Sequence, residues 1–162
     1  MEIFLTNLGK YNEGELVGKW ISLPISSEEL AEVLLEIGID GAEYEEYFIT
    51  DYEAPFKVEE YDNLERLNEI AEDLENFTET ELKLFSVIEG EFSDIETAID
   101  KVKDGEILYY EDISNEEDLG QVIADYWEIP EHLAMYIDYE AIGRNATYEG
   151  WTIADGIAYY LG

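Results

Sequence analysis

Carboxylates are the main reactive side chains of this sequence. Of its 162 residues, 42 are Asp or Glu and 8 are Lys or Arg, which gives a net charge of −34 at pH 7. Two carboxylates at a fixed separation can hydrolyse a glycosidic bond, and clustered carboxylates bind divalent cations. Because acids occur everywhere in the chain, no single pair stands out. A small carboxylate-based enzyme, similar to a glycoside hydrolase, therefore stays an alternative interpretation.

Other catalytic and metal-binding residues are scarce. The sequence has no Cys and a single His, His132, so it contains no disulfide, thiolate site or histidine-rich metal centre. A nucleophile elbow, a P-loop and a His-Glu-x-x-His motif are all missing. Residues 112–118 match a calcium-binding EF-hand loop poorly. We therefore expect no enzyme, no cofactor and no dedicated metal site.

The acids are arranged in rows that basic residues seldom interrupt. Glu65, Glu69 and Glu72 have the spacing i, i+4, i+7, which places them on one face of a helix, where each like-charge pair costs about 0.2–0.5 kcal/mol. A single row of this kind is typical of a solvated helix face. Similar clusters occur at residues 43–46 and 116–118, and three rows with few cations between them favour a functional use of the charge. We predict that the following carboxylates bind a partner: Glu43, Glu45, Glu46, Asp51, Glu65, Glu69, Glu72, Asp73, Glu116, Glu117, Asp118 and Asp125.

The negative charge is spread evenly along a chain that is able to fold. Residues 1–61, 62–104 and 105–162 carry net charges of −12, −10 and −12, and 46% of the residues are hydrophobic and 14% aromatic. This composition argues against disorder. Duplex DNA carries one charge per ~1.7 Å, so 34 charges equal those of about 17 base pairs. The composition thus predicts a partner that binds polyanions.

The same charge disfavours other partners. Anionic membranes and DNA itself would repel this chain. The N-terminal residues lack the basic and apolar regions of a signal peptide, and no apolar run reaches the length of a membrane span. We expect a cytoplasmic protein with no membrane contact and no direct binding of nucleic acid.

Residues 1–60 predict a small module of strands and one helix. Strands are expected over residues 3–8, 16–23 and 45–52, with a turn-rich connection over residues 9–14. Ser26 and Glu29 form a capping box before a helix over residues 28–37, which Gly38 ends.

The rest of the chain predicts a helical middle and a mixed C-terminal part. Three helices over residues 61–104 would begin with capping boxes at Asp62, Thr78 and Ser93. Residues 105–162 predict a strand over 107–111, a helix capped by Ser114, a helix that Pro130 opens and Gly143 ends, and two strands over 148–153 and 157–161. The fold class is α+β, with three small domains at 1–60, 61–104 and 105–162.

The sequence resembles a known protein family near both ends. The run Asn7-Leu8-Gly9-Lys10-Tyr11-Asn12-Glu13-Gly14-Glu15-Leu16-Val17-Gly18 resembles the opening signature of the ArdA antirestriction proteins. Glu45-Glu46-Tyr47, Asp51-Tyr52-Glu53 and Pro55-Phe56 continue the resemblance. Near the C-terminus it includes Tyr136-Ile137-Asp138-Tyr139-Glu140-Ala141 and Gly143-Arg144. In the helical middle only pattern and acidity agree.

The resemblance implies a DNA mimic of mobile genetic elements. ArdA proteins occupy the DNA-binding groove of Type I restriction-modification enzymes and thereby block restriction, and often modification, of incoming DNA. The resemblance also implies an elongated chain of three small domains and a homodimer joined through the C-terminal domain. Candidates for that interface are Tyr109, Tyr110, Tyr136 and Tyr139. An acidic chaperone of basic proteins remains a further alternative.

Overall fold

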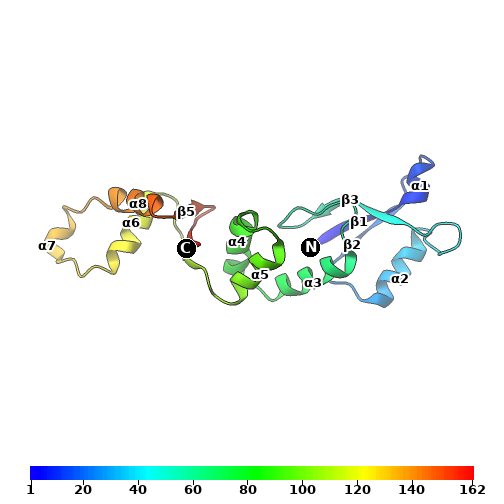
Figure 1. Cartoon of the computed structure of the whole chain (residues 1–162), viewed down its shortest axis with the longest axis horizontal. Helices are drawn as coiled ribbons and strands as arrows, with labels where there is room; N and C mark the ends of the chain where they lie inside the picture. Colours follow the sequence, from blue (N-terminus) through cyan, green and yellow to red (C-terminus); the bar gives the residue numbers. More distant parts are fainter. The chain divides into compact units, whose positions relative to one another are not determined.

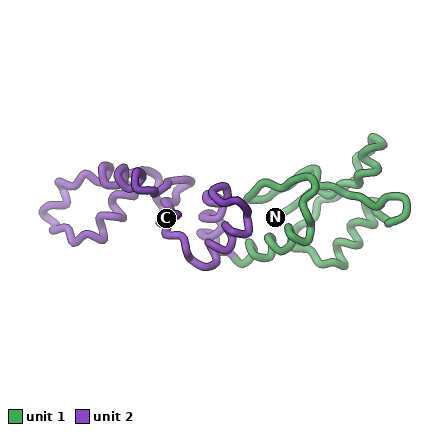
Figure 2. Tube along the Cα trace, in the orientation of Figure 1, with its two compact units in different colours: residues 1–76 green, residues 77–162 purple.

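The computed structural model describes residues 1–162, which form two compact units, Met1–Asn76 and Phe77–Gly162 (Figures 1 and 2). Each unit combines helices with one three-stranded antiparallel sheet. The predicted mixed α+β class is therefore confirmed. The division into three domains at 1–60, 61–104 and 105–162 is finer than these two units and stays a prediction.

The sheet of the first unit has the strand order β2-β1-β3. Its strands are β1 (Glu2–Asn7), β2 (Gly18–Ser22) and β3 (Tyr47–Glu53), and the register of β1 with β3 shifts between Phe4 and Leu5. Along β1, the alternating Ile3 and Leu5 are completely buried, as expected for a strand with one face on a core. The three strands predicted here are confirmed, with shorter bounds for the second.

The residues after β1 form a short helix rather than the expected turn. Helix α1 (Leu8–Asn12) begins at Asn7, whose side chain accepts a hydrogen bond from the Lys10 amide. Asn7 is completely buried, and its side-chain amide (Nδ2) donates to the backbone carbonyl of Ile37 at 3.0 Å. The buried Asn7 thus starts α1 and links it to Ile37, which follows α2 (Ser27–Glu36). No local sequence pattern reveals this long-range contact.

Helices α2 and α3 complete the first unit. Helix α2 (Ser27–Glu36) begins with the predicted capping box of Ser26 and Glu29. Helix α3 (Leu64–Glu75) begins one residue later than predicted, because Asn63 rather than Asp62 caps it. The Asp62 carboxylate instead accepts from the Glu59 amide.

The second unit begins with helices α4 (Glu79–Ile88) and α5 (Ile95–Lys103), which the short 3₁₀ helix η1 (Glu89–Glu91) separates. Thr78 and Glu81 form the predicted capping box of α4. At α5 the prediction of Ser93 is wrong: Asp94 caps the helix by accepting from the Thr97 amide at 2.8 Å. The Ser93 hydroxyl instead donates to the Asp94 carboxylate at 2.9 Å.

Two further helices, α6 (Glu116–Asp125) and α8 (Tyr139–Tyr148), pack closely together, with the short α7 (Glu131–Ala134) between them in sequence. Asn115 caps α6 in place of the predicted Ser114. The prediction that Gly143 ends a helix is wrong, because Gly143 lies inside α8. A Cβ at Gly143 would lie 1.7 Å from the backbone oxygen of Glu116, so this glycine permits the close approach of α8 to α6.

The sheet of the second unit has the strand order β4-β6-β5, with β4 (Leu108–Glu111), β5 (Trp151–Ala154) and β6 (Ile157–Tyr160). Asp155 and Gly156 have φ of 47° and 78°, which makes the predicted tight hairpin turn. The core beside this sheet includes Ile113, Leu119, Ala146 and Ala158. Strand β5 begins later than predicted because α8 extends to Tyr148.

Candidate functional site

The carboxylates lie at the surface of both units. None of the 42 acidic residues is buried, and the buried polar side chains are Thr6 and Asn7. Most of the acidic side chains are exposed rather than half-buried. The fold thus buries hydrophobic residues and leaves nearly all of its negative charge exposed to solvent.

Helix α3 carries the clearest acidic row. Its apolar face consists of the buried residues Leu64, Leu67, Ile70, Ala71 and Leu74. Glu65, Glu69 and Glu72 are exposed, and the Glu72 carboxylate accepts a weak hydrogen bond from the Asn68 amide at 3.5 Å. Asp73 is half-buried and has a partner of its own. The buried stripe therefore fixes the orientation that holds three carboxylates together in solvent.

The other acids predicted in the first unit lie in or near strand β3. Glu43, Glu45 and Glu46 are exposed in the connection between α2 and β3, and Asp51 is exposed on β3 itself. The Asp40 carboxylate shapes this connection by accepting from the amides of Ala42 and Glu43 at 2.9 and 3.0 Å.

Sequence reasoning missed Glu60, which lines a groove together with Asp51. The segment that carries Glu60 returns to β3, where the Glu60 carbonyl accepts from the Ile49 amide at 2.8 Å. The sequence of the eight residues between Asp51 and Glu60 does not reveal that the chain returns to β3.

The acids predicted in the second unit lie at the two ends of α6. Glu116 and Asp118 are half-buried in its first turn, Glu117 is exposed there, and Asp125 is exposed in its last turn. The Asp118 carboxylate accepts from the Ser114 amide at 2.9 Å, so it helps to fix the start of the helix. Glu140 of α8 lines one shallow groove with Glu116 and Glu117, and sequence reasoning missed it.

Cationic side chains neutralise only a small part of this charge. Exposed or half-exposed ion pairs join Lys10 to Glu13 and Glu15, Lys19 to Glu36, Lys57 to Glu59, Arg66 to Asp62, Lys101 to Glu106 and Arg144 to Glu140. Eight cations cannot pair with 42 acids. The remaining field is available to a basic partner.

Hydrogen bonds favour the ionised form of several carboxyl groups. The Tyr44 hydroxyl lowers the pKa of Glu13, and the Ser26 hydroxyl lowers that of Glu29. Backbone amides at Ala42 and Glu43 lower the pKa of Asp40. A glycosidase requires the opposite, a general acid with a raised pKa. The pKa values of Glu13, Glu29, Asp40 and Glu81 are all shifted downward.

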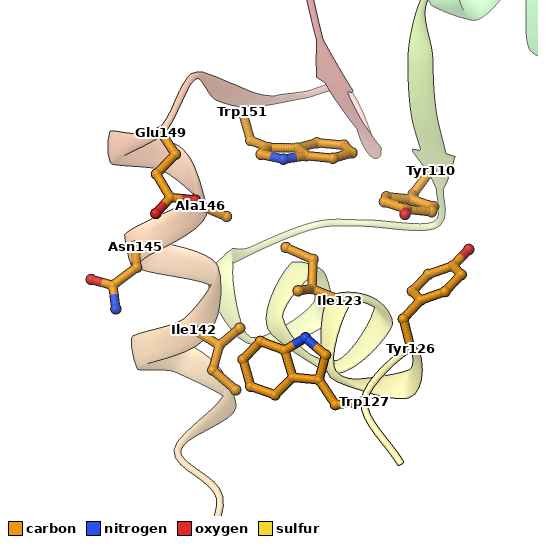
Figure 3. A pocket seen from close by; sticks show the side chains of 9 residues that line it. All are labelled: Tyr110, Ile123, Tyr126, Trp127, Ile142, Asn145, Ala146, Glu149 and Trp151. Atoms are coloured by element: carbon orange, nitrogen blue, oxygen red, sulfur yellow. The ribbon is translucent and has the colours of Figure 1, made fainter. Parts of the chain in front are cut away.

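The second unit also carries an aromatic pocket. Tyr110 stacks on Trp151 with ring centroids 5.1 Å apart, and the burial of Tyr110 raises its pKa. A pocket of about 440 Å³ lies beside this pair, and α6 and α8 complete it (Figure 3). Its lining consists of Tyr110, Ile123, Tyr126, Trp127, Ile142, Asn145, Ala146, Glu149 and Trp151.

The four tyrosines predicted for a dimer interface differ in exposure. Tyr109, Tyr110 and Tyr139 are half-buried, whereas 78% of Tyr136 is exposed. Further large apolar side chains are exposed in the same stretch of sequence: Tyr126, Trp127, Leu133, Met135 and Tyr148. Residues 126–148 thus present an unusual amount of apolar surface for such a charged chain.

The described chain contains no group of three or more His, Cys, Asp or Glu side chains placed to hold a metal ion. Its helices are also too short or too polar to cross a membrane.

Comparison with known proteins gives one family. The family described as antirestriction protein (ArdA) matches residues 3–159. A search of curated proteins finds no match. The family match includes both compact units and nearly the whole chain.

Proposed function

Because this chain belongs to the ArdA family of antirestriction proteins, we propose that it inhibits Type I restriction-modification enzymes by mimicking DNA. The observation that carries the proposal is the surface: 42 acids, none of them buried, accompanied by eight cations that are largely paired. On this proposal, the carboxylates take the place of DNA phosphates in the binding groove of the enzyme.

The physical basis of the mimicry is the release of counterions. A DNA-binding protein gains affinity when its Lys and Arg displace the ions condensed on phosphates. A dense carboxylate surface offers the same gain. The proposed contacts are the predicted acids on α3, β3 and α6, together with the α2–β3 connection. Affinity is then divided among many carboxylates, so that no single one is essential.

We also propose that the protein is a homodimer. The support is the exposed apolar surface of residues 126–148, where 78% of both Met135 and Tyr136 is accessible to solvent. Exposed apolar residues in such number commonly mark an association site. A second copy would bury it and would double the number of carboxylates offered to the enzyme.

Competition with DNA tests the proposal directly. A purified Type I methyltransferase is bound to a labelled duplex that contains its target site, and the protein is added in increasing excess. We expect the DNA to be released, with the same midpoint by gel shift and by fluorescence anisotropy. DNA that stays bound at excess protein would show that the proposal is wrong.

Salt dependence and partner choice sharpen this test. The complex with the enzyme should weaken steeply as ionic strength rises, because counterion release drives it. Polylysine and histones serve as controls for an unspecific acidic chaperone. Equal affinity for these polycations and for the methyltransferase would favour the chaperone interpretation instead.

A further inference from the structure

A groove on the first unit has features that a uniform phosphate mimic does not need. It lies beside sheet β2-β1-β3, has a volume of about 500 Å³ and combines aromatic rings with carboxylates. Its lining consists of Phe4, Tyr11, Leu16, Trp20, Phe48, Thr50, Asp51 and Glu60. Figure 1 shows the elements that contribute to it, α1 and the three strands of this sheet.

Paired residues of the three strands form one half of the groove. Phe4 of β1 lies opposite Trp20 of β2 and opposite Asp51 of β3. The Phe4 and Trp20 rings meet edge to face, with centroids 5.4 Å apart. A Cβ at Gly18 would lie 2.6 Å from the Phe4 ring, so the glycine leaves the space that this ring occupies.

Residues after β1 build the other half. Tyr11 of α1 meets Phe48 of β3 edge to face, with ring centroids 5.1 Å apart. Phe48 is buried, whereas Tyr11, Leu16 and Trp20 remain exposed. Exposed apolar and aromatic side chains that line one groove are suited to meet a partner.

The charges around these rings have one sign. Asp51 and Glu60 are exposed, and no cationic side chain lines the groove. The two lysines nearest in sequence to the aromatic residues are engaged elsewhere. Lys10 contacts Glu13 at 3.2 Å, and Lys19 forms its ion pair with Glu36 of α2. The groove therefore attracts a cation that the chain itself does not supply.

We propose that this groove binds the guanidinium group of an arginine side chain from the DNA-binding groove of the restriction enzyme. The inference rests on the proposed function and adds a specific contact to it. A guanidinium is planar and weakly hydrated, stacks on aromatic faces and donates to carboxylates, whereas a lysine ammonium is compact and strongly hydrated. DNA-binding proteins are rich in arginines that contact phosphates and bases.

Amide chemical shifts of the 162-residue chain give the first test. The probes are Nα-acetyl-arginine amide, the equally charged Nα-acetyl-lysine amide and the neutral isostere Nα-acetyl-citrulline amide, each at 150 mM salt. We expect the arginine probe to shift amides around Trp20, Phe48 and Asp51 more than the other two probes do. Equal shifts with the lysine probe, or shifts spread over the acidic surface, would overturn the inference.

Matched variants locate the site. Asp51→Asn with Glu60→Gln removes two charges from the groove, whereas Glu28→Gln with Glu32→Gln removes two exposed charges from α2. The groove variant should bind the arginine probe about tenfold more weakly, since each exposed ion pair contributes a few-fold to a binding constant. The α2 variant should bind it as the unchanged protein does. Equal weakening by both variants would show that the probe binds through the overall negative charge, and the proposed site would be wrong.

A second substitution tests the aromatic part. Trp20→Leu keeps an apolar residue in β2 but removes the ring. It should lose the preference for arginine over lysine while circular dichroism stays unchanged. A preserved preference would overturn the role of the ring.

The competition assay separates this inference from the proposed function. If the protein displaces DNA but the groove variant and the α2 variant are equally effective, the arginine contact is wrong and the mimicry stands. If the arginine probe binds the groove but the protein fails to displace DNA, the groove binds arginine but the restriction enzyme is not the protein that supplies it.

Discussion

The two compact units have similar sheets but expose different surfaces. Each contains three antiparallel strands, ordered β2-β1-β3 in the first unit and β4-β6-β5 in the second. Both carry exposed carboxylates. The first unit adds an acidic helical row and an aromatic groove, whereas the second adds the apolar surface of residues 126–148. Negative charge is therefore common to both units, whereas the aromatic and apolar surfaces differ between them.

Three glycines, Gly143 and Gly120 in the second unit and Gly9 in the first, differ in what an added Cβ would meet. In the second unit, a Cβ at Gly143 or Gly120 would meet backbone atoms, at 1.7 Å from the Glu116 oxygen and 1.8 Å from the Tyr139 oxygen. In the first unit, a Cβ at Gly9 would meet the Tyr44 ring at 2.3 Å. A side chain can rotate away from such a clash, but the backbones of two packed helices cannot.

The largest expected effect follows from this difference. Gly143→Ala should lower the free energy of unfolding by about 3 kcal/mol, because an added methyl group forces α6 and α8 apart. Gly9→Ala should cost less, since Tyr44 can move. Gly90→Ala, where nothing lies within 4 Å, is the control. Thermal unfolding followed by circular dichroism measures all three, and equal effects of Gly143→Ala and Gly90→Ala would contradict the close packing.

The second prediction separates the association surfaces. Met135→Ser with Tyr136→Ser should weaken the proposed dimer about 30-fold, as expected when a central apolar contact worth ~2 kcal/mol is lost. Leu35→Ser, which changes an exposed apolar residue of the first unit, should leave dimerisation unchanged. Sedimentation equilibrium gives both dissociation constants. A monomeric unchanged protein, or equal weakening by Leu35→Ser, would refute this assignment.

The third prediction concerns the acidic helices and has opposite signs in the two units. Glu69→Gln should stabilise the first unit by about 0.5 kcal/mol, because it removes like-charge repulsion with Glu65 and Glu72. Glu117→Gln should destabilise the second unit by about 0.5 kcal/mol, because an acid in the first turn of α6 interacts favourably with the helix dipole. Urea titrations measure both changes. Two changes of equal sign would contradict this interpretation of the charge.

The smallest expected effect is a pH-dependent change in the stability that the capping boxes contribute. The Ser26 hydroxyl lowers the pKa of Glu29 below 4.5, and the Thr78 amide lowers that of Glu81. A lowered pKa means that each carboxylate stabilises the fold fully above pH 4.5 and loses this contribution as the pH falls through the folded-state pKa. The stability difference between the unchanged protein and Ser26→Ala should therefore shrink from pH 6 to pH 3. Repulsion among the remaining acids cancels in this difference, and a constant difference would show that the hydrogen bond does not favour the ionised form.

Sequence reasoning predicted the parts of this protein that depend on nearby residues. Alternating side chains predicted the strands, and Ser26-x-x-Glu29 and Thr78-x-x-Glu81 predicted two helix starts, because a capping box closes within four residues. The Asp155-Gly156 turn also needed only local backbone geometry. The acidity itself follows from composition, and its position at the surface follows from the cost of burying a charge.

Only the tertiary structure decided the features that join distant residues. Gly143 has the local pattern of a helix stop, yet it lies within α8, where its missing side chain admits the backbone of Glu116. Glu140 joins Glu116 and Glu117, and Glu60 joins Asp51, through chain returns that no short pattern encodes. The sequence by itself determined that this protein is a folded polyanion with these local elements. Long-range packing determined which carboxylates and rings share a surface, because that depends on contacts between residues far apart in the chain.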